Sequence, residues 1–512
     1  MTSPPPPASD DIPTTTLDVL ITGAGLSGIN AAHLLQTHLP RRTFAVLEAR
    51  HTIGGTWAFW KYPGARTDSA MALFGFPWHA WTQGTTMVDA PTIKAYMDEA
   101  VAAHGIDRAI RLGHRVTSAA WSSAEHRWTV EVEVVAEDEA TVVGRKRFSA
   151  GWLINANGYY AYDKPLGSVI PGIEGFQGEV VHPQFWDEEK VDYAGKKVVV
   201  VGSGATAVTL LPALAKTAES VTMLQRSPSY VLSQPAKDHS VRFFARYLPA
   251  SWVPTVNWWW RMAVETIFVA ILTNFPNFGR KIVVGEMRKE LPQGFDVDKH
   301  FNPRYGPFEQ RLCFCPRADF FKALHQDNTQ VVTDTIETVT ETGILLKSGQ
   351  TLEADMIITA TGLYMVLMYG IALIVDGVRV NETFGRRYAW NGVMLEGIPN
   401  SGVIMGYTAA TWTPGADVRT RQMIKVMQHM EKTGVTSAVP FISPEERKNL
   451  PMVPAIDISS TYVVSAKERM PIVANVGPWR NGKNWLSDVL RLKLGSVTAG
   501  MRYTTVEKSK NV

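Results

Sequence analysis

The chain shows the same order of apolar and polar positions twice. A short apolar run, at 17–22 and again at 196–201, leads into a glycine-rich stretch, after which apolar residues recur at helical spacing. Continuous apolar runs are typical of strands buried on both faces, and their alternation with helices indicates a parallel sheet. The pattern predicts an α/β fold with two Rossmann-like dinucleotide-binding domains.

The first glycine motif is Gly23-Ala-Gly25-Leu-Ser-Gly28. Its glycines allow a tight turn and let the backbone approach a pyrophosphate at the start of the following helix. The next apolar run, 43–47, ends in Glu48, whose carboxylate would accept hydrogen bonds from ribose hydroxyls and repel a 2′-phosphate. We therefore expect FAD at this site, with NAD as the alternative.

The second motif is Gly202-Ser-Gly204-Ala-Thr-Ala207, in which alanine suits the third position because that residue only has to pack closely against the sheet. The next apolar run is followed by Arg226 and Ser227 where the first site has an acid. A cation here can pair with a 2′-phosphate, so we expect NADPH. The other interpretation of Arg226 is a solvated surface cation.

Two further apolar strands, at 153–158 and 355–362, end in an Ala-x-Gly turn. In flavoproteins with two dinucleotide sites, such strands mark where the chain leaves the FAD domain and later returns. The expected layout is a disordered Pro-rich tail (1–16), a first FAD-domain segment (17–158), an NADPH domain (159–355) and a second FAD-domain segment (356–512). Within the NADPH domain, 236–300 is rich in Trp, Phe and Leu at helical spacing and predicts a helical subdomain that could cap the substrate pocket.

Composition excludes several classes of protein. The formal net charge is only +3 over 512 residues, so no broad nucleic-acid surface is implied. Cys313 and Cys315 are the only cysteines, which leaves neither a disulfide framework nor a Cys-ligated zinc site and fits a reducing, cytoplasmic location. We expect no metal site.

One apolar segment raises the question of a membrane. Three tryptophans, 258–260, precede an uncharged run at 266–279 that is interrupted by Pro276. The run is shorter than the roughly 18–20 residues of a spanning helix. We expect an amphipathic helix packed against its own protein, with peripheral membrane contact through the tryptophans as the alternative.

The stretch Phe176-Gln-Gly178-Glu-Val-Val-His182-Pro-Gln-Phe-Trp186-Asp187 matches the pattern F-x-G-x-x-x-H-x-x-x-W-[PD]. With this fingerprint, the chain resembles class B flavin monooxygenases, and within them type I Baeyer–Villiger monooxygenases of the bacterial ethionamide-activating branch. The resemblance implies that NADPH reduces FAD, that a C4a-peroxyflavin forms with O₂, and that ketones become esters or lactones. Sulfides are further expected substrates, and a heteroatom oxygenase with little ketone activity is the close alternative.

The resemblance also implies roles for individual residues. Gly55, Thr56 and Trp57 match a Gly-Gly-Thr-Trp turn that lies against FAD. Arg311 matches the catalytic arginine and Asp68 the carboxylate that positions it; the alternative is that the two form a plain salt bridge or never meet.

Other matches concern the linker and a loop. Arg66 is expected to be structural, while His182 and Trp186 are expected to act in the linker between domains. Trp479 and Asn484 resemble a loop that closes over bound NADP⁺.

Gln310 stands where many cyclic-ketone enzymes carry Lys, and the absence of that charge would weaken the preference for NADPH. A small apolar ketone or thioether and O₂ are the expected substrates. A non-catalytic NADP(H)-binding sensor is the alternative from another class.

Overall fold

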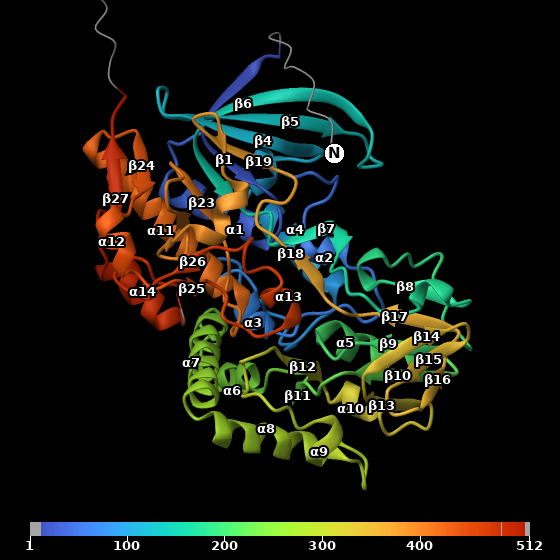
Figure 1. Ribbon diagram of the computed structural model, residues 1–512. Coiled ribbons are helices and arrows are strands. Elements are labelled where there is room, and N and C mark those ends of the chain that lie inside the picture. Colours follow the sequence, from blue (N-terminus) through green and yellow to red (C-terminus); the bar gives the residue numbers. More distant parts are fainter. Residues whose placement is uncertain (1–11, 483, 507–512) are drawn as a thin grey trace, which may run out of the picture.

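The computed structural model describes residues 12–482 and 484–506, which form two α/β parts built on separate sheets (Figure 1). The larger sheet has nine strands in the order β20-β19-β4-β5-β6-β1-β2-β3, with β23 also pairing with β6. Its strands are β1 (Thr14–Thr22), β2 (Phe44–Leu47), β3 (Ile110–Arg111), β4 (His114–Ser122), β5 (Arg127–Val135), β6 (Val142–Asn155), β19 (Ala372–Val375), β20 (Val378–Arg379) and β23 (Ser401–Val403). Because β1 starts at Thr14, the predicted tail is too long by three residues; residues 1–11 lie outside the described chain.

The carboxyl-terminal part of β1, Val19–Thr22, is buried on both faces, as its apolar sequence requires. Val19 and Ile21 belong to the core that contains residues of α1 (Leu26–His38), α4 (Ala90–Ala103) and α11 (Trp412–Thr433). Leu20, which points the opposite way, belongs to a second core under the other face of the sheet. This double burial confirms the inference drawn from the apolar run at 17–22.

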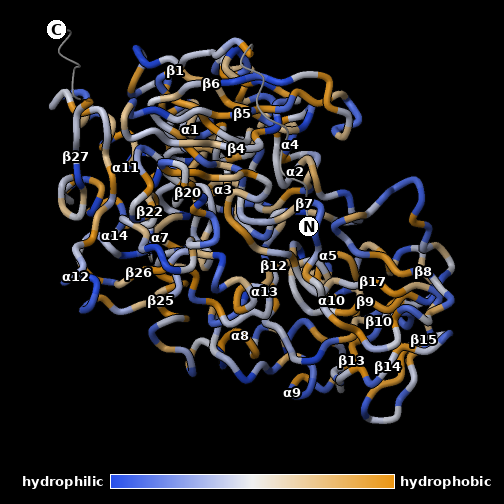
Figure 2. The backbone as a smooth tube through the Cα atoms, turned by 45° about the horizontal axis from the view of Figure 1, so that its top comes forward, coloured by the Kyte–Doolittle hydropathy of each residue, from blue (hydrophilic) through white to orange (hydrophobic). Residues whose placement is uncertain are grey.

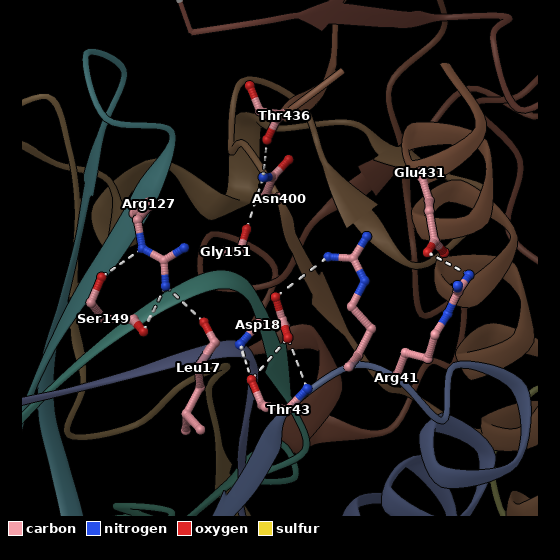
Figure 3. Close-up of polar contacts among 11 residues, drawn as sticks. Leu17, Asp18, Arg41, Thr43, Arg127, Ser149, Gly151, Asn400, Glu431 and Thr436 are labelled. Atoms are coloured by element: carbon pink, nitrogen blue, oxygen red, sulfur yellow. Dashed lines mark hydrogen bonds and ion pairs between the residues drawn. The ribbon is translucent and has the colours of Figure 1, made fainter. Parts of the chain in front are cut away.

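Side-chain hydrogen bonds hold the strands around β1 in register (Figure 3). Asp18 accepts hydrogen bonds from the backbone N–H and the hydroxyl of Thr43, both at 2.8 Å. Arg127 donates to the carbonyl oxygens of Leu17 at 2.7 Å and Ser149 at 2.9 Å. Asn400 joins β6 to a distant loop by donating to the Gly151 carbonyl at 2.8 Å. These bonds lie around Leu17 and Asp18, so they fix β1 just before its buried part, which leads to the first glycine motif.

The second sheet has five parallel strands in the order β13-β10-β9-β17-β8. They are β8 (Glu179–Val181), β9 (Lys197–Val201), β10 (Ser220–Gln225), β13 (Thr329–Thr333) and β17 (Met356–Thr359). Helix α5 (Ala205–Leu214) follows β9 and packs on the sheet. Apolar sequence concentrates in β9 and β10 (Figure 2). The α/β class and the two Rossmann-like units predicted from the sequence are therefore present.

The position of β17 corrects the expected domain boundary. Met356 to Thr359 pair with Val198 to Val201 in the second sheet, so this strand does not begin the return to the larger sheet. The chain crosses back only after it, where β18 (Leu363–Met365) pairs antiparallel with β7 (Tyr160–Pro165). The two connections between the parts therefore run side by side.

The predicted helical segment is confirmed and contains α6 (His239–Tyr247), α7 (Val253–Asn274), α8 (Pro276–Glu290) and α9 (Val297–His300). Val253, Met262 and Leu272 of α7 are buried, so one face packs on the protein as expected. Among the described residues no single helix is long and apolar enough to cross a membrane; α7 and α8 pass that test only as a pair, with a bend of 115° between them.

Smaller elements complete the structure. They are α2 (Thr56–Phe59), α3 (Met71–Phe74), β11 (Tyr230–Gln234), β12 (Leu312–Pro316), α10 (Asp319–Ala323), β14 (Ile336–Thr340), β15 (Gly343–Leu346), β16 (Thr351–Glu353), β21 (Ala389–Trp390), β22 (Met394–Leu395), β24 (Ser437–Pro440), α12 (Pro444–Asn449), β25 (Val453–Pro454), α13 (Thr461–Val464), β26 (Ile472–Val473), α14 (Trp485–Leu494) and β27 (Met501–Thr504). Of these, α2, β12 and α13 carry residues of the site described next.

Candidate active site

A cavity of about 1300 Å³ lies between the two α/β parts and is lined by both glycine motifs. Gly23 and Gly25 line it at the carboxyl end of β1, and Gly202 and Gly204 at the carboxyl end of β9. Ligands of open α/β sheets bind at this end of the strands. The volume exceeds the roughly 300–1000 Å³ of most small-molecule pockets, so the cavity has room for more than one ligand.

The backbone of the first motif fits a dinucleotide. Gly23 has φ +94°, and a Cβ there would lie 2.8 Å from the Ala156 carbonyl oxygen, so only glycine suits this turn. Gly25 precedes α1, and no side chain caps the N–H groups at the start of that helix. Free N–H groups at a helix start are a ready site for a pyrophosphate. Gly28 lies beneath the turn, where a Cβ would be 1.8 Å from the Gly23 carbonyl oxygen.

Glu48 directly follows β2 at the wall of the cavity. Its Oε2 accepts from the Ala24 N–H at 2.7 Å and its Oε1 from the Arg50 N–H at 3.1 Å. Burial raises the pKa of the Glu48 carboxyl, and these two N–H donors oppose that rise. Each oxygen keeps a free acceptor position, which matches the predicted contact with ribose hydroxyls.

The turn at Gly55 reaches the same wall. A Cβ on Gly55, whose φ is +54°, would lie 3.0 Å from the Gly25 Cα, so this turn lies against the first motif. Thr56 and Trp57 begin α2 and line the cavity. The Trp57 ring packs edge-on against Phe74 at 5.4 Å between centroids. The structure thus gathers 23–28, Glu48 and 55–57 at one end of the cavity, although they are spread over 35 residues of sequence.

The second motif repeats the geometry of the first. Gly202 has φ +140°, and a Cβ there would lie 2.4 Å from the Ala360 carbonyl oxygen. Gly204 precedes α5, whose first N–H groups also have no side-chain cap. Ala207 is fully buried, in agreement with the packing role expected of it. Arg226 is exposed on the cavity wall, where its guanidinium donates only one long hydrogen bond, 3.4 Å to the Thr461 hydroxyl.

Ser227 and Gln310 also line this end of the cavity. The Ser227 carbonyl accepts a hydrogen bond from the Ser203 hydroxyl at 3.2 Å, which ties the end of β10 to the second motif. Gln310 carries no charge, so Arg226 is the cation of this group. Arg226 lies on the cavity wall, and its contact with a 2′-phosphate stays a prediction.

Arg311 and Asp68 lie together in the cavity. The Arg311 Nη1 is 3.9 Å from the Asp68 Oδ2, and the Arg311 Nε donates to the Tyr462 hydroxyl at 3.0 Å. The contact with the Tyr462 phenol raises the pKa of Arg311 further above its already high value, against the opposing effect of burial. The side chain therefore presents a fixed positive charge at the wall of the cavity.

Three tyrosines that the sequence analysis did not identify surround this arginine. Tyr159, Tyr160 and Tyr462 line the cavity, and the rings of Tyr159 and Tyr160 are 4.3 Å apart. Burial raises the pKa of Tyr159 and Tyr160, so both phenols stay neutral. Tyr159 and Tyr160 directly follow the Asn-Gly turn at 157–158, which could have drawn attention to them. Tyr462 has no local signal, because it reaches Arg311 from 151 residues away.

Arg66 has the structural role expected of it. Its guanidinium forms a two-point ion pair with Asp319 at the start of α10, with the second bond at 3.1 Å. His182 follows β8, lines the cavity and accepts the Gln184 N–H at 3.2 Å. Burial lowers the pKa of His182, which keeps its ring neutral. Trp186 is buried against Tyr193.

The expected cofactor contact of Trp479 is wrong for this structure. Trp479 is fully buried in the core under α12, where its indole N–H donates to the Glu446 carboxylate at 3.3 Å. It does not line the cavity. Asn484 caps α14 by accepting the Ser487 N–H at 2.9 Å. Within the described chain, no group of three His, Cys, Asp or Glu side chains is arranged to hold a metal ion.

Comparison with known proteins agrees with this geometry. Residues 21–90 match an NAD(P)-binding Rossmann-like domain and residues 88–246 a flavin-binding monooxygenase-like family. The chain is 42% identical over 481 residues to the FAD-containing monooxygenase EthA of Mycolicibacterium smegmatis, covering 94% of this chain and 95% of that protein. It is 40% identical over 492 residues to EthA of Mycobacterium tuberculosis, covering 95% and 97%.

Solved structures support the fold. Cyclohexanone monooxygenase from Rhodococcus sp. Phi1 bound to NADP⁺ superposes with a TM-score of 0.72 at 20% identity, covering 96% of this chain and 100% of that one. An oxidized steroid monooxygenase bound to NADP gives a TM-score of 0.71, also at 20% identity, over 96% and 100%. At this identity, the likeness confirms the arrangement of two dinucleotide-binding units.

Proposed function

The chain belongs to the family of FAD-containing monooxygenases that includes EthA, and on this premise we propose that it is an NADPH-dependent Baeyer–Villiger monooxygenase. The proposed reaction inserts one oxygen atom of O₂ into a ketone to give an ester or lactone, and sulfides are oxygenated as well. The observation that carries the proposal is the position of Arg311, held by Asp68 and Tyr462 in a cavity that joins both nucleotide motifs.

The residues at the first motif fit FAD. Gly23, Gly25 and the uncapped start of α1 would hold the pyrophosphate, and Glu48 would accept the ribose hydroxyls. Gly55 to Trp57 would lie against the rest of the cofactor. When bound, the flavin takes up reducing equivalents from NADPH and supplies the activation of O₂.

Arg311 is suited to stabilise negative charge. Addition to a ketone carbonyl turns its oxygen into an anion, and a charged donor in a cavity stabilises that charge more than water does. Arg311 stays protonated at any working pH and offers several N–H groups in one plane. Asp68 and Tyr462 hold two different edges of the guanidinium, which fixes its orientation. The rings of Tyr159, Tyr160 and Tyr462 line the cavity around it.

The second motif fits NADPH. Gly202, Gly204 and the uncapped start of α5 would hold the pyrophosphate, and Arg226 would pair with the 2′-phosphate. Because Gln310 adds no charge, the discrimination against NADH rests on Arg226 with help from Ser227. We expect a preference for NADPH that is modest and sensitive to salt.

A side-by-side assay tests the proposal. Purified, FAD-loaded protein is given NADPH with a linear ketone in one reaction and a thioether in another, and products are identified by gas chromatography–mass spectrometry. Ester from the ketone supports the proposal. Sulfoxide without ester would replace it by heteroatom oxygenation, and hydrogen peroxide alone with both substrates would contradict it.

A further inference from the structure

Exposed apolar side chains form a line along α7 and α8. Their exposed fractions run from 36% to 62%, and each lies three or four residues after the previous one, which places them on one face of each helix. The line consists of Trp260, Val264, Ile267, Ile271, Phe275, Phe278 and Ile282. Single exposed apolar residues are normal on a protein surface, but a row of this length marks an interaction site.

The charged residues of α7 face the protein instead of water. Arg261 donates to Asp238 at 2.8 Å, and that carboxylate is buried. Glu265 accepts hydrogen bonds from the Thr411 N–H at 2.9 Å and hydroxyl at 2.6 Å, and burial raises its pKa. A helix in contact with water normally turns its charged side outward. In α7 this arrangement is reversed, so its outer face suits an apolar environment.

The neighbouring helices extend the surface. Phe243 and Tyr247 of α6 are exposed, and Phe244 packs edge-on against Trp260 at 6.4 Å between centroids. On the other side, Trp485 at the start of α14 packs against Trp259 at 5.3 Å. Helices α6, α7 and α8 lie together at one end of the molecule, away from the large sheet (Figure 1).

Basic side chains accompany this surface. Arg242 and Arg246 are exposed on α6, which contains no acidic residue, and Lys281 is exposed beside Ile282 on α8. Tryptophan and phenylalanine together with Arg and Lys are the composition of helices that lie in the interface of a membrane with anionic lipids. A symmetric contact between two copies of the chain would instead bring these like charges together.

We propose that α6, α7 and α8 form a peripheral docking surface for a membrane that contains anionic lipids. The 115° bend between α7 and α8 lets both helices lie along the membrane surface instead of crossing it. The surface adjoins the active site, because Phe268 of α7 packs near Phe314, which lines the cavity, with ring centroids 6.5 Å apart. Docking would therefore bring the cavity close to a source of apolar substrates.

Sedimentation of FAD-loaded full-length protein with vesicles tests this proposal. We expect binding to vesicles of phosphatidylcholine with phosphatidylglycerol and much weaker binding to phosphatidylcholine alone. The triple variant Trp260→Gln, Ile267→Gln, Phe278→Gln should bind on the order of 100-fold more weakly, because each side chain loses its apolar burial in the interface. The matched control is Val143→Gln, Val378→Gln, Met452→Gln, which changes three apolar residues that are at least as exposed and lie elsewhere in the chain.

A charge-reversal variant keeps the test valid if the first variant misfolds. Arg242→Glu, Arg246→Glu, Lys281→Glu should lower binding to the anionic vesicles by about fivefold per charge. Retention of the flavin absorbance shows that each variant is folded. The proposal is overturned if the wild-type protein does not bind to anionic vesicles. It is also overturned if light scattering shows that the wild-type protein is a dimer and the triple Gln variant a monomer, since a second copy would then cover this surface. Oxygenation of a water-soluble ketone should be unchanged in both variants, so failure here is distinct from failure of the proposed function.

Discussion

Replacing Asp68 with Asn tests whether this carboxylate acts only through Arg311. The substitution keeps the shape of the side chain and removes its charge. Two unit charges 3.9 Å apart attract by about 4 kcal/mol at an effective dielectric constant of 20. Both side chains are more than a third exposed, at 36% and 40%, so solvent screening reduces this to about 1 kcal/mol. We therefore expect Asp68→Asn to lower kcat by about fivefold.

Arg311→Ala should have a much larger effect. Loss of a single preorganised donor to a developing oxyanion typically costs about 100- to 1000-fold in kcat. If Asp68 acts only by orienting Arg311, the double variant should be no slower than Arg311→Ala alone. Tyr462→Phe, which removes the other partner of the guanidinium, serves as the matched control and should show the same non-additivity.

The assay measures oxygenated product and NADPH consumption in the same reaction for the wild type and each variant. The rate of product formation measures the oxygenation step, in which Arg311 acts. NADPH consumption without product measures reduction of the flavin that is not followed by oxygenation. If the effects of Asp68→Asn and Arg311→Ala multiply in the double variant, Asp68 has a role of its own and does not act only by positioning Arg311. The same conclusion follows if Asp68→Asn alone is as slow as Arg311→Ala.

Three further predictions concern the nucleotide sites and stability. Arg226→Ala should raise KM for NADPH by about 10-fold or more and leave KM for NADH unchanged, measured by NADPH and NADH oxidation; equal changes would show that Arg226 does not contact the 2′-phosphate. Gly202→Ala should lower Tm because its Cβ would meet the Ala360 carbonyl oxygen at 2.4 Å, whereas Gly204→Ala, with no neighbour within 4 Å, should keep Tm and weaken NADPH binding. Burial lowers the pKa of His33 to about 4. Between pH 6.5 and 4, His33 is therefore protonated in the unfolded chain and neutral in the folded chain. Stability should then fall as pH drops from about 6.5 towards 4, and His33→Gln should lose less, measured as urea midpoints at several pH values.

Local signals account for what the sequence predicted well. Each glycine motif directly follows a strand and directly precedes a helix. The local sequence of 17–28 and of 196–207 is therefore enough to predict the strand, the turn and the start of the helix. The positions of Glu48 and Arg226 at the cavity follow for the same reason, since each comes directly after the next strand, whereas their nucleotide contacts stay predictions. The alignment of Arg311 with Asp68 came from the family resemblance, because nothing local to either residue indicates the other.

Non-local pairing accounts for what was missed. The apolar run at 355–362 resembles the one at 153–158, but its partners in β9 lie more than 150 residues away, and its sheet could not be read from its own sequence. Trp479 lies in a short Pro-Trp segment. A tryptophan in such a segment can bury its ring in the protein core or against a ligand, and the local sequence does not distinguish the two. The periodicity of 253–282 indicates an apolar stripe, but only the packing of Arg261 and Glu265 shows that part of this stripe faces outward.

Isotope labelling tests the central claim most directly. FAD-loaded protein is supplied with NADPH, a linear ketone and ¹⁸O₂, and the ester is examined by mass spectrometry. We expect one labelled oxygen in each ester molecule, and ester formation by Arg311→Ala that is about 100- to 1000-fold slower despite continued NADPH oxidation. Unlabelled ester, or labelled hydrogen peroxide with no organic product from either a ketone or a thioether, would contradict it.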